Sequence, residues 1–130
     1  MFSHVMIGAD DVEKSKSFYD KVLGTLGIPP GRLETHRDGR SRALYVTPTG
    51  LFALTQPLNR KPTTTANGST LGFAASSPEQ VKAWHDAGVA AGGTSIEDPP
   101  GVREAAVGKL YLAYLRDLDG NKICALHRMT

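Results

Sequence analysis

Residues 117–126 read DLDGNKICAL, and they determine how the chain ends. Gly120, in the middle of this stretch, predicts a tight turn because glycine adopts backbone angles that other residues avoid. The apolar pattern after the turn predicts a last strand over 121–128, paired with a strand over 109–116 (KLYLAYLR). We therefore expect the chain to end in a β-hairpin, with Cys124 on its second strand.

The rest of the second half predicts a strand, a helix and a further strand before this hairpin. Residues 70–75 (TLGFAA) are typical of a strand. Ser77 is a good helix cap, and it is followed by a proline and an acidic residue, as at many helix starts. Glycines at 92 and 93 end the helix. A short strand over 94–97 and a loop over 98–108 (DPPGVREAAVG) complete the half.

The first half predicts the same order of elements. A strand over 2–8 leads to a helix that begins after the cap Asp11. Strands over 32–37 and 40–47 flank Asp38 and Gly39, a strong hairpin signal, and a short strand over 51–56 follows. Each half thus reads β-α-β-β-β, and the polar stretch 59–69 (NRKPTTTANGS) is a linker between them.

The two halves also match residue by residue. An offset of 66 relates Asp11 to Ser77, Phe18 to Trp84, and Gly27 to Gly93. An offset of 72 relates residues 51–54 (LFAL) to 123–126 (ICAL). Two amphipathic helices can look alike by chance, but a repeat that carries caps, strands and turns in one order favours duplication. We predict one α+β domain over 1–130, with modules at about 1–58 and 69–130, a linker at about 59–68, and a curved, cup-shaped mixed sheet of eight strands.

Composition excludes several classes of function. The formal net charge is +2, and the basic residues are scattered, so neither a nucleic acid nor a membrane surface is an expected partner. The chain has no apolar run of the roughly 20 residues that a membrane span needs. Its single cysteine excludes an internal disulfide, which fits a reducing cytoplasm, and the N-terminus has no signal-peptide pattern.

At this point the chain resembles the vicinal oxygen chelate superfamily, which includes glyoxalase I, the bleomycin resistance proteins and the extradiol dioxygenases. The resemblance rests on His4 in the first strand, on the helix DVEKSKSFYDKVLG at 11–24, and on the closing DLDGNKICAL. The family closes with a similar Asp-Pro-Asp-Gly-Asn turn, in which Leu118 here replaces the proline. The resemblance implies two modules around a cup, which often pair further into homodimers.

The resemblance also implies where a metal would bind. Metal-using members carry a ligand on the first and last strand of each module, and those positions here are His4, Phe52, Thr70 and Cys124. Only His4 is of the usual ligand type, and with Cys124 it makes two ligands where a catalytic zinc site needs about three. Iron oxygenases use two histidines and a carboxylate. We therefore expect no metal and no other cofactor.

We expect these positions to line a pocket for a small organic molecule instead. The predicted ligand-pocket residues are His4, Phe52, Gln56, Thr70, Tyr114 and Cys124. The first hypothesis is a metal-free binding protein that takes a small, partly aromatic or apolar molecule. The alternative is an enzyme of the same superfamily, such as a lyase, isomerase or dioxygenase, with an atypical ligand set or with His4 as a metal-free catalytic group. A third is a partner-binding role with a cup filled by its own side chains.

Overall fold

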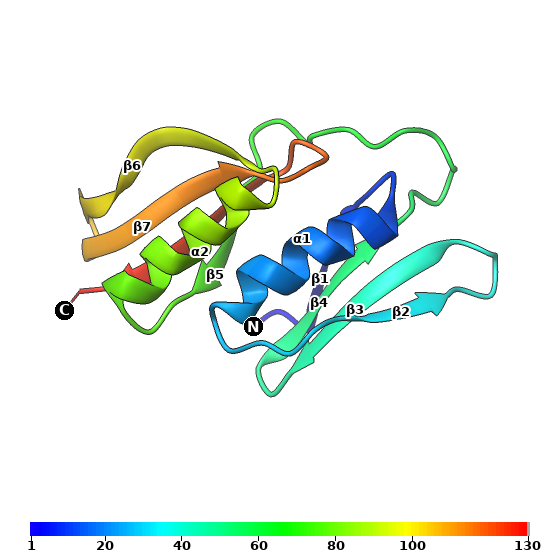
Figure 1. The fold of residues 1–130 in the computed structure, drawn as a ribbon, viewed down its shortest axis with the longest axis horizontal. Coiled ribbons are helices and arrows are strands. Elements are labelled where there is room, and N and C mark those ends of the chain that lie inside the picture. The colour runs from blue at the N-terminus through cyan, green and yellow to red at the C-terminus, as the bar shows by residue number, and fades with distance from the viewer. Residues whose placement is uncertain (130) are drawn as a thin grey trace.

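The computed structural model describes residues 1–129, which fold into two modules with the same order of elements (Figure 1). The first module contains β1 (His4–Gly8), α1 (Val12–Gly24), β2 (Arg32–Thr35), β3 (Ser41–Thr47) and β4 (Gly50–Thr55). The second contains β5 (Leu71–Ala74), α2 (Pro78–Ala90), β6 (Thr94–Ala105), β7 (Gly108–Arg116) and β8 (Lys122–Arg128). The predicted α+β repeat is confirmed.

Backbone hydrogen bonds divide the eight strands into two mixed sheets of four. The strand orders are β1-β4-β3-β2 and β5-β8-β7-β6, so the two sheets correspond strand for strand. In each sheet the first strand of the module runs parallel to the last, and the other pairs are antiparallel. In the described residues β1 and β5 are edge strands that do not pair with each other, so the modules meet along a seam without a continuous ladder.

The helix starts follow the caps that the sequence predicts. The Asp11 carboxylate accepts a hydrogen bond from the Lys14 amide at 3.1 Å, and the Ser77 hydroxyl accepts one from the Gln80 amide at 3.1 Å. Each cap satisfies a backbone donor that the first turn of a helix leaves free. Within residues 1–129, neither helix has the length and apolar composition needed to cross a membrane.

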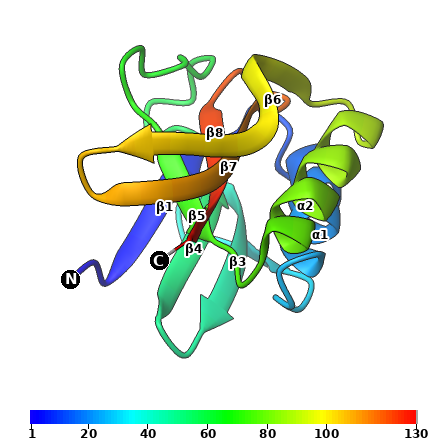
Figure 2. The same cartoon turned by 90° about the vertical axis from the view of Figure 1, so that its left-hand side faces the viewer.

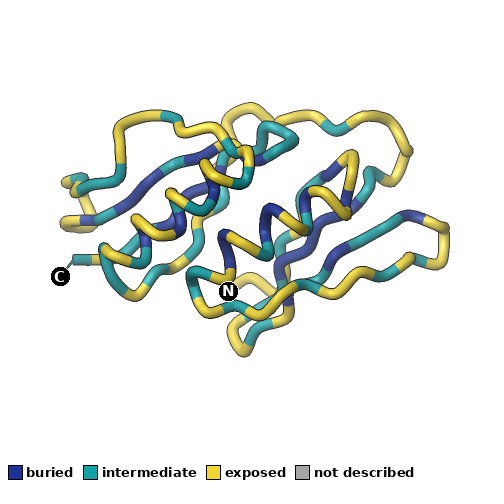
Figure 3. The backbone as a smooth tube through the Cα atoms, viewed as in Figure 1, coloured by how far each residue is buried: buried dark blue, intermediate teal, exposed yellow. Residues whose placement is uncertain are grey.

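One hydrophobic core joins the two modules. The helices lie side by side on one side of the sheets, and the buried stretches of backbone face one another between helices and strands (Figures 1, 2 and 3). Trp84 is fully buried and Tyr45 is 2% exposed, as expected for core residues. Phe52 of the first module packs edge-to-face on Phe73 of the second, with ring centroids 5.3 Å apart. Packing of apolar side chains therefore holds the two modules together along the seam, where their strands do not pair.

The segment 98–108 is not the loop that the sequence predicts. Most of it belongs to β6, which pairs with β7 on both sides of a register shift between Ile96 and Gly101. The shift contains Pro99 and Pro100, which have no amide hydrogen and cannot donate to a ladder. Glu97, at the start of the shift, has a φ of 59°. The prolines suggested a loop because a bulge that accommodates them inside a strand leaves no clear mark in sequence.

Candidate functional site

His4, Thr70 and Cys124 lie on the face of the sheets that is turned away from the helices. Ile7 of β1 packs against the core and Val5, which shares its face, is half-buried, so strand alternation places the exposed His4 on the opposite face. In β8, Ile123 and Ala125 join the core, so Cys124 points away from α2 by the same argument. Thr70 immediately precedes β5 and is equivalent to His4 through the offset of 66.

Phe52 is not on this face, and the predicted offset of 72 was wrong by one residue. Phe52 pairs with Val5 in the first module, and Ile123 pairs with Leu71 in the second. Since Val5 and Leu71 are related by 66, Phe52 corresponds to Ile123, and the true offset of the last strands is 71. A slip of one residue in a strand exchanges its two faces. Phe52 therefore packs in the core.

The residue equivalent to Cys124 is Ala53, and this decides whether the family's metal site fits. The four positions that correspond to the metal ligands of the family, and that face away from the helices, are therefore His4, Ala53, Thr70 and Cys124. Alanine offers no donor atom, and a threonine hydroxyl is a poor ligand for zinc or iron. In the part of the chain that the structure describes, no three His, Cys, Asp or Glu side chains gather closely enough to hold a metal ion. These residues do not fit the family's metal site.

Cys124 sits in surroundings that keep its thiol protonated. It is 5% exposed, and burial raises its pKa to about 11, against an opposing effect of the Lys122 ammonium. Its neighbour across the hairpin is Tyr114. The ammonium of Lys122 lies 4.7 Å from the centre of the Tyr114 ring and forms an ion pair with Glu97. A neutral, buried thiol is a weak nucleophile and a weak metal ligand.

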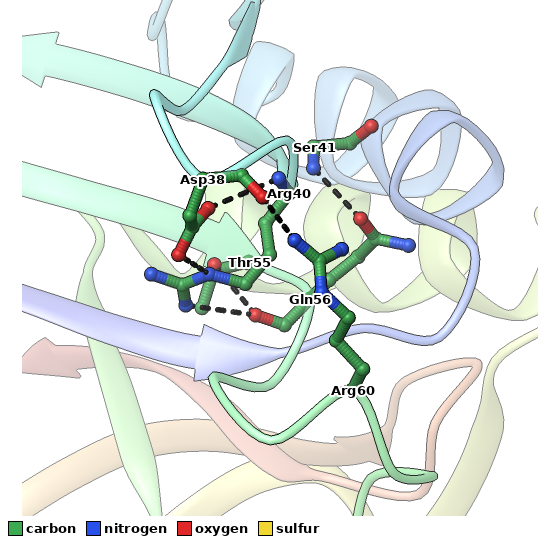
Figure 4. Close-up of polar contacts among 6 residues, drawn as sticks. All are labelled: Asp38, Arg40, Ser41, Thr55, Gln56 and Arg60. Carbon is green, nitrogen blue, oxygen red and sulfur yellow. Dashed lines mark hydrogen bonds and ion pairs between the residues drawn. The ribbon is translucent and has the colours of Figure 1, made fainter.

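Gln56 has a structural role at the far end of β4 (Figure 4). Its side-chain oxygen accepts a hydrogen bond from the Ser41 amide at 2.7 Å, and its backbone oxygen accepts one from the Arg40 guanidinium at 3.2 Å. Arg40 is itself buried and paired with Asp38 at 2.7 Å, while Arg60 donates to the backbone oxygen of Asp38. These contacts fix the β2–β3 hairpin and the chain after β4, away from the predicted pocket.

A cleft of about 600 Å³ lies between β1 of the first module and β5 and the start of β8 of the second, and we call it the seam cleft. Thr70 lines it, together with Lys122 and the hydroxyls of Thr64 and Ser69. Its apolar walls come mainly from β1 and β5, with Phe2, Met6, Ile7 and Leu71. The seam cleft thus combines apolar surface with a few polar groups, as small-molecule sites usually do.

The seam ends differently on its two sides. At one end the β7–β8 turn of the second module reaches across to the first. Asp119 accepts from the Asp10 amide at 3.0 Å and from the Ser15 hydroxyl at 2.9 Å. The buried carboxylate of Asp117 accepts from the Tyr19 hydroxyl at 2.6 Å, and the Asn121 amide donates to the Gly8 carbonyl at 3.2 Å. We call this the closed end.

At the other end a cleft of about 310 Å³ remains, which we call the open-end cleft. It lies between the start of β1, the end of β5, the C-terminal end of α1 and the β3–β4 turn. His4 and Phe52 line it, and the His4 imidazole is within 2.8 Å of the Ser3 hydroxyl. The contributions of α1 and of Phe73 were not predicted, because they depend on how the modules pack together.

The structure therefore does not gather the six predicted residues into one pocket. Thr70 lines the seam cleft, His4 and Phe52 line the open-end cleft, and Tyr114 and Cys124 pair on the second sheet. Gln56 is remote from all of them. Lys122 shares the seam cleft with Thr70, and its alternation with Cys124 along β8 was the one signal that pointed to it.

Comparisons with known proteins agree on one family. The model of the Glyoxalase/Bleomycin resistance protein/Dioxygenase superfamily matches residues 1–125. A search of curated proteins found no match. The crystal structure of a glyoxalase/bleomycin resistance protein from Albidiferax ferrireducens T118 is 62% identical, with a TM-score of 0.93 over 98% of this chain and 99% of that one.

More distant structures share the fold. A glyoxalase/bleomycin resistance protein/dioxygenase family enzyme from Burkholderia phytofirmans PsJN is 21% identical, with a TM-score of 0.69 over 98% of both chains. A lactoylglutathione lyase from Agrobacterium tumefaciens is 18% identical, with a TM-score of 0.64 over 98% of this chain and 92% of that one. At these identities the likeness extends to the fold alone.

Proposed function

Because the chain belongs to the glyoxalase/bleomycin resistance protein/dioxygenase superfamily, we propose that it binds a small organic molecule in the seam cleft without a metal. The observation that carries the proposal is the set of residues facing away from the helices. His4 stands there with Ala53, Thr70 and a protonated Cys124, so the ligand chemistry of the metal-using members is missing. What the seam cleft offers instead is shape and a few polar groups.

The lining of the seam cleft favours a molecule with an apolar body and oxygen-bearing substituents. Met6 and Leu71 provide apolar contact, while the Thr70 hydroxyl and the Lys122 ammonium provide hydrogen bonds. Lys122 already neutralises Glu97, so a carboxylate on the ligand would compete with Glu97 for the ammonium. A ligand bearing hydroxyl or carbonyl oxygens meets no such competition.

The test is calorimetric titration of EDTA-treated protein with a panel of aromatic alcohols, ketones and carboxylic acids. We expect at least one compound to bind with one site per chain in the absence of metal. Ser69→Phe, which narrows the seam cleft, should weaken that binding at least tenfold, and Leu33→Ser, an exposed change on β2, should leave it unchanged. No binding by any compound without metal, followed by binding after zinc, nickel or iron is added, would overturn the proposal.

We also propose that two copies of the chain associate through the first sheet. Met6 and Val46 lie on its uncovered face and are 37% and 70% exposed, and Phe2, which precedes β1, is 74% exposed. Neighbouring apolar side chains of this size favour a protein contact. Sedimentation velocity should give a dimer that Val46→Glu converts to a monomer; a monomeric wild type contradicts this.

The unpaired Cys124 suits a reducing cytoplasm.

A further inference from the structure

The open-end cleft exists because the two β-hairpin turns differ in length. The β7–β8 turn has five residues between Arg116 and Lys122, whereas the β3–β4 turn has two between Thr47 and Gly50. The longer turn reaches α1 and closes its end of the seam. The shorter turn provides no side chain that fills the corresponding space, so the aromatic core is accessible from that end.

The receiving helix has changed as well. Ser15 and Tyr19 of α1 receive the long turn, and the offset of 66 places Val81 and His85 of α2 at the equivalent positions. Val81 is fully buried, and the His85 ring is within 2.8 Å of the Ser95 hydroxyl. Neither side chain offers a hydrogen bond to a turn from the first module, so this end lacks the polar partners of the closed end.

The walls of the open-end cleft are aromatic and aliphatic. Its described lining residues include no Asp, Glu, Lys or Arg, and His4 is the one histidine among them. The hydroxyls of Thr47 and Thr49 lie 3.3 Å apart at its rim, and the Tyr45 hydroxyl is already committed to Asp20 at 2.8 Å.

We propose that the open-end cleft, which adjoins the seam cleft and shares Phe2, Val5, Leu71 and Gly72 with it, is a second binding site for a neutral aromatic molecule of two or three rings. Its volume of about 310 Å³ is at the lower end of the range of ligand pockets. The rings of Phe52 and Phe73 offer an edge-to-face pair against which a further ring packs. A ligand with an anionic group is disfavoured, because no lysine or arginine lines the cleft to replace the water lost from that group.

The experiment uses two fluorescent probes with the same skeleton. N-phenyl-1-naphthylamine is neutral, and 8-anilino-1-naphthalenesulfonate adds one sulfonate. We expect the neutral probe to bind the wild-type chain with one site and at least tenfold more tightly than the anionic probe. Equal affinities, or tighter binding of the sulfonate, would overturn the proposal, because they point to a site with a cationic side chain such as the seam cleft.

Variants then locate the neutral probe. Ala74→Phe and Thr49→Trp fill the open-end cleft from opposite walls, and each should weaken binding at least tenfold. Thr49 is exposed on a turn, so its variant keeps the test valid if Ala74→Phe unfolds the chain. Ser69→Phe in the seam cleft should leave the affinity for the neutral probe unchanged. Neutral-probe binding that survives Thr49→Trp, or that is lost in Ser69→Phe, contradicts the proposal, whatever ligand the seam cleft takes.

Discussion

Each end of the seam contains a tyrosine that donates to an aspartate, but only one of these pairs links the modules. At the closed end Tyr19 of α1 donates to Asp117, which lies 98 positions further along the chain. At the open end Tyr45 of β3 donates to Asp20 of α1, within the first module. The same chemistry thus fastens the two modules together on one side and fixes a cleft wall on the other.

The difference shows how one half of a repeated fold can leave open a cleft that the other half closes. Strand order and helix caps are equal in both halves, so the fold does not depend on what distinguishes them. Turn length and the residues that receive the turn do differ. Loops tolerate such changes at little cost to the elements they connect. In this chain three fewer residues in one turn leave an aromatic cleft uncovered.

The largest effect should come from removing the link at the closed end. Asp117 is buried and accepts hydrogen bonds from the Tyr19 hydroxyl and from the backbone of its own turn, at Asp119 and Asn121. Asp117→Ala leaves these donors unpaired, and we expect a loss of about 3 kcal/mol in the free energy of unfolding. Urea denaturation measures it. Thr49→Ala in the other turn is the control, with an expected change below about 0.5 kcal/mol.

The two halves also differ where α1 packs against α2. Val22 of α1 corresponds to Gly88 of α2, and a Cβ at Gly88 would lie 2.2 Å from a methyl group of Leu115 and 3.3 Å from one of Val22. Gly88→Ala should therefore destabilise the chain by about 2 kcal/mol through overpacking, despite the better helix propensity of alanine. Gly24→Ala, where the added methyl meets nothing within 4 Å, should leave stability equal or slightly higher. Equal losses in thermal unfolding would contradict tight packing at Gly88.

Removing each tyrosine hydroxyl compares the two ends directly. We expect Tyr19→Phe to cost about 2 kcal/mol and Tyr45→Phe about 1 kcal/mol, because Asp117 is buried and Asp20 is partly open to solvent. Urea denaturation of both variants in one buffer gives the difference. A larger loss for Tyr45→Phe would mean that the open end contributes more to stability than the link between the modules.

The smallest effect is a pH dependence at the open end. Burial alone would raise the pKa of Asp20, but hydrogen bonds from Lys16, the Gly31 amide and Tyr45 outweigh it, so the pKa is lowered from 3.8. A carboxyl pKa that is lower in the folded chain stabilises the fold at pH values above the pKa of the unfolded chain. This stabilisation is lost as the pH falls through the pKa of the folded chain.

We therefore expect wild type to lose its advantage over Asp20→Asn as the pH drops from 6 to below 4. Asp20 is partly exposed, so the change should be below about 1 kcal/mol. Urea denaturation of both proteins at pH 6.0, 4.0 and 3.0 checks the sign. A stability difference that stays constant over this range would show that the hydrogen bonds to Asp20 do not depend on its charge.

Local signals in the sequence were sufficient for the repeat and its elements. The caps Asp11 and Ser77 and the Asp38–Gly39 turn stand where short-range chemistry requires them. Gly39 and Gly120, the glycines of the two predicted hairpin turns, have positive φ. The predicted site was less successful. Matching LFAL to ICAL made Phe52 the equivalent of Cys124. The strand pairing shows that the equivalent residue is Ala53, one position further along the chain.

Strand register carries the physical reason for that error. Composition alone cannot decide which of two adjacent residues faces the core when both are apolar, as Phe52 and Ala53 are. The clefts were beyond sequence reasoning for a different reason. They depend on how Leu71 and Phe73 pack against the other module, and no local pattern specifies that contact.

Metal titration of the chelator-treated chain tests the central claim most directly. We expect Zn²⁺, Ni²⁺, Mn²⁺ and Fe²⁺ to bind without a defined stoichiometry. His4→Ala should not change the amount of metal bound. A variant that combines Ala53→Glu, Thr70→His and Cys124→Glu should gain one site per chain, because it restores carboxylate and imidazole ligands around His4. One tightly bound ion per wild-type chain, lost in His4→Ala, would contradict the account.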